Sequence, residues 1–215
     1  GVTLGNPRLG FVCTMQTTDG QPGLEGYFYE YDHDLAPEER LRFAPEEVSP
    51  VFDLDAMPTL DASDWPEERV RKALRNYAMQ YVRNLLPEIV RVFGPLEGAN
   101  LGRSAARLIG MQYYRETAEM LGVTQTGPSG FAAFMTALGA GQGDEMSTEE
   151  AGGTLVVRQH TWKLMRRVAP LDDAVFEAWN GLWEGALAVH DRSLHLAVTR
   201  RLDRGDNCFE WRLGR

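Results

Sequence analysis

The fold is decided near the end of the chain by residues 193–213, which read SLHLAVTRRLDRGDNCFEWRL. Apolar and polar residues alternate in both halves of this stretch, as half-buried β-strands require. The segment between the halves is rich in Asp, Asn and Gly, which favour turns. The stretch therefore predicts a terminal β-hairpin in which Val198 lies opposite Trp211. Leu196 then lies opposite Leu213 on the same side.

The alternation gives this hairpin two different faces. One face is apolar and belongs to the core. On the other face, the expected register pairs Thr199 with Glu210. It also pairs Arg201 with Cys208, and His195 lies one step further out. We expect this second face to be either in contact with solvent or the floor of a polar site.

Length and charge limit the possible functions. With 215 residues and 43% hydrophobic content, the chain can bury one sizeable core, so we expect one domain with an appended arm. The 22 basic and 31 acidic residues give a net charge of −9, which argues against nucleic acid and anionic membrane surfaces as partners. No apolar run is long enough for a bilayer and no signal peptide is recognisable, so we expect a cytoplasmic protein.

Residues 1–62 are the least globular part of the sequence. The runs 8–16 and 24–31 have strand-like composition and are joined by Asp-Gly and Pro-Gly turn signals, so they predict an aromatic β-ribbon. Residues 32–61 predict an extended arm with room for one helical turn. The tyrosines of the ribbon can pack on the main domain, on a second subunit or against an aromatic ligand, so a homodimer is one expected arrangement.

Residues 63–215 predict an α+β domain that begins with helices. Apolar residues recur every three or four positions over 66–86, which predicts a helix with one buried stripe. Pro87 is expected to kink or end this helix, and residues 88–93 are expected to add a further turn or two before Gly94-Pro95 stops it. The later predicted elements are helices over 98–121, 128–138 and 175–190, a Gly-rich acidic loop over 139–153 and a strand over 153–160. This order predicts a helical block packed on one face of a small antiparallel sheet that ends in the C-terminal β-hairpin.

The hairpin also carries a motif. Residues 205–211 read GDNCFEW, a Gly-Asp-x-Cys-x-x-aromatic string that follows a helix and a strand. This pattern resembles the end of the L-2-amino-thiazoline-4-carboxylic acid hydrolase-like family. It is also similar, more remotely, to the 4-vinyl reductase type of small-molecule-binding domain. The order of helices over residues 66–213 is compatible with the first family.

The first resemblance implies a hydrolase that cleaves a C–N bond of a cyclic amidine, an amide or a related heterocycle. Such a reaction needs a nucleophile or an activated water, a proton donor, and cations for a substrate carboxylate. We assign catalytic roles to Cys208, His195 and His190. We expect no metal and no cofactor. The predicted substrate-binding residues are Arg103, Arg158, His160, Trp162 and Arg201.

The alternative is a non-catalytic binding or sensing module, as in the second family, in which the cavity only holds a small ligand. The absence of His-Glu-x-x-His and Gly-x-Ser-x-Gly motifs favours this module, and a purely structural dimer is a third option. For the site, we expect the hairpin face with Cys208, Arg201 and His195 to look into a cavity roofed by the helices. Arg201 beside the thiol would favour the reactive thiolate. The other interpretation of Cys208 is a small buried apolar group.

Overall fold

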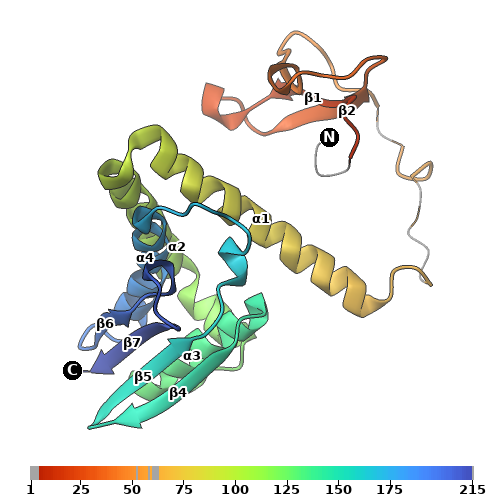
Figure 1. The fold of residues 1–215 in the computed structure, drawn as a ribbon. Coiled ribbons are helices and arrows are strands. Elements are labelled where there is room, and N and C mark those ends of the chain that lie inside the picture. Colours follow the sequence, from red (N-terminus) through yellow and green to blue (C-terminus); the bar gives the residue numbers. More distant parts are fainter. Residues whose placement is uncertain (1–4, 52, 58, 60–62, 215) are drawn as a thin grey trace. The chain divides into compact units, whose positions relative to one another are not determined.

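The computed structural model describes residues 5–51, 53–57, 59 and 63–214. The chain divides into two compact units, Gly1–Asp61 and Ala62–Arg215. Figure 1 shows the first unit in red and orange and the second in yellow to blue. None of the helices formed by the described residues is long and apolar enough to span a lipid bilayer.

The described part of the first unit forms a three-stranded sheet with the strand order β2-β1-β3. As predicted, β1 (Leu9–Met15) and β2 (Glu25–Glu30) pair as an antiparallel ribbon. The predicted arm also contributes a strand, β3 (Leu41–Phe43), which pairs in parallel with β1. Three residues are too few for a visible alternation, so the sequence does not reveal β3. A single 3-10 turn, Pro37–Glu39, precedes it.

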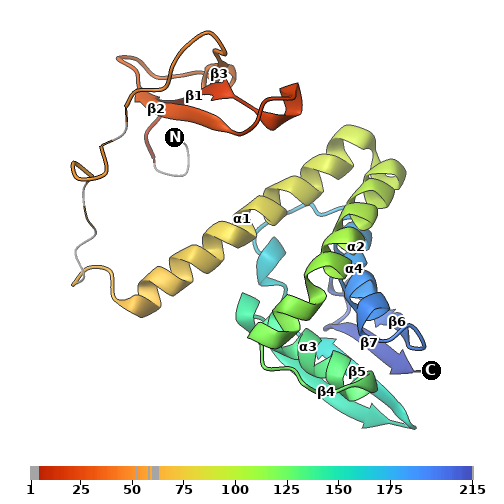
Figure 2. The same cartoon turned by 180° about the vertical axis from the view of Figure 1, so that it is seen from behind.

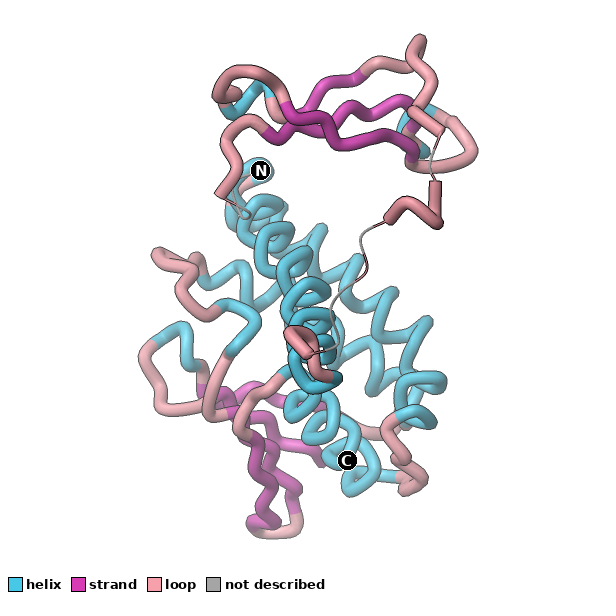
Figure 3. The backbone as a smooth tube through the Cα atoms, turned by 90° about the vertical axis from the view of Figure 1, so that its right-hand side faces the viewer, coloured by secondary structure: helices cyan, strands magenta, loops and turns pink. Residues whose placement is uncertain are grey.

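The described part of the second unit combines four α-helices with a four-stranded antiparallel sheet, which confirms the predicted α+β fold. The strand order of the sheet is β4-β5-β7-β6. Figures 1 and 2 show α3 and α4 on one face of this sheet, and Figure 3 shows the helices on one side of the strands. The elements in chain order are α1 (Glu67–Phe93), α2 (Pro95–Met120), α3 (Gly127–Gln142), β4 (Met146–Ala151), β5 (Thr154–Gln159), α4 (Asp173–His190), β6 (His195–Arg200) and β7 (Phe209–Gly214).

The predicted end of the first helix at Phe93 is confirmed, whereas the loop predicted after the third helix is wrong. As expected, α1 continues beyond Pro87 to Phe93 and stops before Gly94, and Leu86 and Val90 on either side of the proline are buried. This burial offsets the hydrogen bond that proline removes. The predicted loop over 139–153 is instead the end of α3 followed by β4. Gly139 lies inside α3, and its missing side chain leaves room for Met146, whose sulfur would lie 2.5 Å from a Cβ atom at this position.

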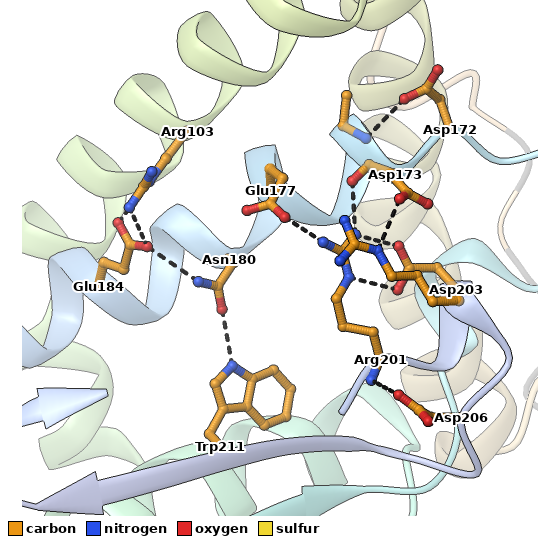
Figure 4. Close-up of polar contacts among 12 residues, drawn as sticks. Arg103, Asp172, Asp173, Glu177, Asn180, Glu184, Arg201, Asp203, Asp206 and Trp211 are labelled. Atoms are coloured by element: carbon orange, nitrogen blue, oxygen red, sulfur yellow. Dashed lines mark hydrogen bonds and ion pairs between the residues drawn. The ribbon is translucent and has the colours of Figure 1, made fainter. Parts of the chain in front are cut away.

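The core of the second unit lies between α4 and the sheet. The planes of Phe176 and Phe209 are stacked with ring centroids 4.7 Å apart. The indole nitrogen of Trp211 donates a hydrogen bond of 2.9 Å to the side-chain oxygen of Asn180 (Figure 4). Aromatic side chains dominate this core: Phe176, Trp179 and Trp183 of α4, and Phe209 and Trp211 of β7. Burial of large apolar side chains such as these is the main favourable contribution to the stability of a fold.

Glycines allow α2 and α4 to approach closely. A Cβ atom at Gly110 would lie 2.3 Å from the carbonyl oxygen of Leu182, and one at Gly185 would lie 2.0 Å from that of Arg107. Both distances are shorter than any van der Waals contact, so only glycine fits at these positions. The two helices therefore form one rigid pair above the sheet, with α1 packed beside α2.

The single buried stripe predicted for α1 is wrong. α1 buries Met79, Leu86 and Val90 on one side. A second group of apolar residues on this helix is 56–65% exposed. We call this group the outer stripe of α1; it consists of Leu74, Tyr77, Tyr81, Leu85 and Val92.

Candidate functional site

The predicted register of the terminal hairpin is confirmed over its apolar part. Val198 pairs with Trp211, and Leu196 pairs with Leu213. Trp211 and Leu213 are completely buried and belong to the core beneath the helices. The helices therefore cover the apolar face of the hairpin. The single cavity expected to hold Cys208, Arg201 and His195 is not formed by the described residues. Arg201 and His195 line two separate cavities bordered by α4, of about 270 and 550 Å³, and Cys208 lines neither of them.

The register shifts one residue later. A β-bulge in β6 makes Arg200, rather than Thr199, the partner of Glu210. One extra residue reverses the faces of the residues that follow it, so Arg201 turns toward the helices. The predicted pairing of Arg201 with Cys208 is therefore wrong. Thr199 still donates a hydrogen bond of 2.8 Å to the Glu210 carboxylate through its hydroxyl group.

Arg201 is held at the start of α4 (Figure 4). Its guanidinium group lies 4.1 Å from the centroid of the Phe176 ring. It forms ion pairs with Glu177 and Asp203, and it donates a hydrogen bond of 2.9 Å to the backbone carbonyl oxygen of Asp173. The charge of Arg201 therefore ties the hairpin turn to α4 and is compensated within the fold.

Cys208 is 1% exposed. Burial raises the pKa of its thiol above the usual value, against the opposing charge of Arg200. A buried neutral thiol is a poor nucleophile. His195 pairs with Gly214, which follows Cys208 by six residues and lies about 20 Å further along the strand at a rise of about 3.3 Å per residue. The structure does not bring this thiol and this imidazole together.

His190 joins three helices. Its Nε2 atom lies 2.8 Å from the carbonyl oxygen of Gly127, and its Nδ1 atom is hydrogen-bonded to the hydroxyl group of Tyr114. Because a carbonyl can only accept, Nε2 donates, and in the neutral ring Nδ1 accepts the Tyr114 proton. Burial raises the pKa of Tyr114, which favours this arrangement. Both nitrogens of His190 are therefore occupied by partners other than His195 and Cys208.

Two other residues predicted to bind the substrate, Arg103 and Arg158, form ion pairs with carboxylates of the protein itself. Arg103 forms a two-point ion pair with Glu184, with distances of 2.8 and 2.9 Å (Figure 4). Arg158 lies between Glu149 at 2.6 Å and Glu210 at 2.7 Å, on the sheet face turned away from the helices. An arginine in such a pair offers little net charge to a further anion.

The two remaining candidates have different surroundings. His160 is exposed, and its Nε2 atom lies 2.8 Å from the hydroxyl oxygen of Ser147 on β4. The ring of Trp162 packs edge-on against Phe209 with centroids 5.0 Å apart, so it belongs to the aromatic core. The described residues also contain no group of three or more His, Cys, Asp or Glu side chains arranged to hold a metal ion.

A group of positively charged side chains lies elsewhere, around a cavity of about 480 Å³ between α1, the C-terminal end of α3 and residues 163–167. We call it the cationic cavity. Six of the described residues that line it are basic. None of the described lining residues carries a carboxylate. Its lining consists of Lys72, Arg75, Asn76, Met79, Gln80, Arg83, Gln142, Gly143, Lys163, Arg166 and Arg167.

Helical spacing aligns one wall of the cationic cavity. Lys72, Arg75, Met79 and Arg83 recur at intervals of three and four residues, so they share one face of α1. Arg83 extends from this face to the opposite wall. Its guanidinium donates hydrogen bonds of 2.6 Å to the carbonyl oxygen of Leu164 and 2.7 Å to that of Lys163.

Asp144 fixes the other wall. Its carboxylate is 6% exposed and accepts hydrogen bonds from the Gln159 amide at 2.8 Å, the Thr161 hydroxyl at 3.0 Å and the Lys163 backbone nitrogen at 2.7 Å. Burial raises the pKa of Asp144, and these hydrogen bonds oppose that shift. The carboxylate is therefore used to order residues 161–163, and it does not line the cavity.

Most of the cations around the cavity are unpaired. Within the described part of the chain, Lys72, Arg75, Lys163, Arg166 and Arg167 form no ion pair with a carboxylate. Arg167 has a left-handed backbone with φ of 67°, a conformation that costs a non-glycine residue about 1–2 kcal/mol. Such strain is concentrated at functional sites in proteins.

The sequence reasoning missed this site, although two signals were present. Basic residues gather at Lys163, Arg166 and Arg167, and others share one face of the first helix. Nothing in the sequence says that these two groups meet. No family model and no curated protein matches the chain.

Proposed function

We propose that the protein is a small-molecule-binding module whose ligand is a small acid with at least two negative charges, held in the cationic cavity. The observation that carries this proposal is the lining of six basic side chains without a carboxylate. It occurs in a protein with a net charge of −9, so it is opposite in sign to the chain as a whole.

Electrostatics favours an anion at this place. The basic side chains that share the cavity repel one another. An anion bound among them is attracted to each of them and offsets this repulsion. One pair of opposite charges 4 Å apart contributes about 4 kcal/mol at an effective dielectric constant of about 20, before the cost of removing water. Arginine contributes more than charge, because its planar guanidinium can bind a carboxylate or a phosphate with two hydrogen bonds.

The cavity also limits the size and polarity of the ligand. A volume of about 480 Å³ lies in the usual range of small-molecule sites. The side-chain oxygen of Gln142 is buried and has no hydrogen-bond partner among the described residues, so a ligand with a hydroxyl or an N–H group suits it. We therefore favour a phosphorylated or multiply carboxylated metabolite. A long nucleic acid would be repelled by the remaining surface.

Binding is favoured over hydrolysis at this cavity. Among the described residues that line it there is no histidine, cysteine, aspartate or glutamate, the side chains that most often carry protons or attack substrates in hydrolases. The hydrolase hypothesis remains a separate prediction about Cys208, His195 and His190, and the separation of His195 from Cys208 along the hairpin does not support it.

A thermal-shift series tests the proposal. Pyrophosphate and citrate serve as probes, with chloride at the same ionic strength as the reference. Both probes should raise the melting temperature of the wild type, because a ligand that binds only the folded state at 100 times its Kd stabilises it by about 2.7 kcal/mol. The double variant Arg75→Gln/Arg166→Gln should lose this shift.

The matched control is Arg115→Gln, which removes an exposed arginine of α2 outside the cavity. It should keep the full shift. Equal loss of the shift in both variants would mean that the anions act on the surface charge in general. No shift in the wild type with either probe would contradict the proposal.

A further inference from the structure

α1 carries apolar residues on two opposite sides, and the second unit covers only one of them. At about 100° per residue, Tyr81 lies about 160° around the helix axis from the buried Met79. The outer stripe of α1, defined above, runs along this second side from Leu74 to Val92. Within one copy of the second unit, this stripe is exposed.

The outer stripe is large for an exposed surface. Its five side chains are each more than half exposed, which corresponds to roughly 500 Å² of mostly apolar area. This is near the upper end of the patches that monomers leave open, about 300–600 Å². It also matches the apolar share of an interface in which each partner buries about 800 Å².

Charges at the ends of the stripe indicate which partner fits. Arg71 and Glu88 are equally far from the midpoint between Met79 and Gln80, and both are exposed. Each forms an ion pair within its own helix, Arg71 with Glu67 and Glu88 with Arg91, and a second copy would extend these pairs. The same midpoint relates Leu74 to Leu85. An antiparallel pair of two α1 helices centred there brings Leu74 of one copy to Leu85 of the other. It also brings Arg71 next to Glu88 at both ends.

A parallel pair has the opposite effect. It brings the two copies of Glu67 together and the two copies of Arg71 together, and like charges facing each other are unfavourable. An antiparallel pair has a two-fold axis, so each copy uses the same surface and the assembly closes as a dimer.

The middle of the stripe contains two tyrosines. The hydroxyl groups of Tyr77 and Tyr81 are 2.8 Å apart, and their rings meet edge-on with centroids 5.3 Å apart. Aromatic side chains with a polar end are enriched near the centres of protein interfaces. We propose that two copies of the chain associate through the outer stripe of α1 as an antiparallel helix pair.

This interface is independent of the cationic cavity. Arg75 and Arg83 of the cavity lie on the same side of α1 as Met79, whereas the outer stripe lies on the opposite side. Loss of dimerisation and loss of anion binding can therefore be told apart.

Sedimentation velocity of the full chain tests whether the protein is a dimer in solution. The wild type should sediment as a dimer at micromolar concentration. Leu85→Glu should raise the dimer Kd at least tenfold without changing the far-UV circular dichroism spectrum, because this side chain is 57% exposed and contributes little to the fold of one copy. The matched control is Leu108→Glu on α2, which is 66% exposed and should leave the dimer intact.

Charge reversal tests the register. Arg71→Glu places two carboxylates together at both ends and should weaken the dimer. Adding Glu88→Arg to that variant restores opposite charges and should recover the dimer. If the double variant is no tighter than Arg71→Glu alone, the proposed register is wrong.

Disulfide formation tests the direction of the helices. A mixture of the single variants Leu74→Cys and Leu85→Cys should give a cross-linked heterodimer, and neither variant should cross-link strongly by itself. The native cysteines, Cys13 and Cys208, are buried and give little background. Strong self-linking of Leu74→Cys would indicate a parallel pair and overturn the proposal. A monomeric wild type at 100 μM would overturn it as well.

Discussion

The Nε atom of Arg83 lies 2.6 Å from the backbone carbonyl oxygen of Leu164, to which it donates a hydrogen bond. This bond links α1 to a segment 81 residues further along the chain. That segment carries Lys163, Arg166 and Arg167, so the bond joins the two walls of the cationic cavity. Arg83 is therefore both a cation of the site and the residue that holds it together.

Removing this link should affect stability and binding together. Arg83→Gln loses charge-assisted hydrogen bonds to two backbone carbonyl oxygens, so we expect the free energy of unfolding to fall by about 1.5–3 kcal/mol. Pyrophosphate should also bind more weakly. Urea denaturation with an unchanged slope measures the first effect. An Arg83→Gln protein as stable as Arg115→Gln would show that the link contributes nothing.

The ion pairs of Glu210 predict the stability of the protein in acid. Burial opposes ionisation of Glu210, but hydrogen bonds from Arg158 and Thr199 outweigh it and hold its pKa below the ordinary value. A carboxyl group whose folded pKa is lowered contributes stability above its unfolded pKa, and this contribution is lost as the pH falls through the folded pKa. The wild type should therefore lose stability below about pH 4.5.

Glu210→Gln should lose less stability over this acid range, although it should be less stable at pH 7, because Arg200 loses its carboxylate partner and Arg158 keeps only Glu149. Urea midpoints at a series of pH values measure both effects. Glu30→Gln is the control, since Glu30 forms an exposed ion pair with Arg8. Parallel pH profiles for wild type and Glu210→Gln would contradict the expectation.

Cys208 should be unreactive in the native protein. It is 1% exposed and burial raises the pKa of its thiol, so iodoacetamide should modify it only after unfolding in urea. Cys208→Ala should lower the free energy of unfolding by about 1 kcal/mol or more through the small cavity it leaves. Mass spectrometry of the labelled peptides separates Cys208 from Cys13. Fast native labelling that a ligand suppresses would instead support the catalytic role predicted from the motif.

Two glycines should respond in opposite ways to substitution by alanine, because only Gly185 lies at the close contact of α2 with α4. Gly185→Ala would place a Cβ atom 2.0 Å from the carbonyl oxygen of Arg107, so we expect a loss of several degrees in melting temperature. Gly141→Ala in α3 meets nothing within 4 Å, and alanine favours a helix by about 1 kcal/mol over glycine. It should therefore raise the melting temperature. Equal effects of the two substitutions would mean that the contact is looser than the distances indicate.

The sequence predicted the parts of the fold that depend on local patterns. The alternation around Trp211 was enough for the register of the apolar hairpin, and the periodicity of residues 175–190 was enough for α4. β4 was missed because it is an edge strand that is largely exposed and shows no clear alternation. Its glutamates and the glycines around it resemble a loop.

The site could not be predicted in the same way, because it depends on contacts between distant segments. The bulge that turns Arg201 away from Cys208 is associated with contacts to Glu177 on α4, which the sequence of the hairpin does not contain. Likewise, Arg75 and Arg166 meet only because α1 packs beside the segment after β5. Periodicity can assign a residue to a face, but it cannot say which segment covers that face.

Isothermal titration calorimetry of pyrophosphate into the wild type and into Arg75→Gln/Arg166→Gln tests the central claim most directly. The wild type should bind one pyrophosphate per chain, with an affinity that falls as the salt concentration rises. The double variant should bind at least tenfold more weakly, while Arg115→Gln should match the wild type. Binding of equal strength in the wild type and in the double variant would contradict the assignment of the cationic cavity as the ligand site.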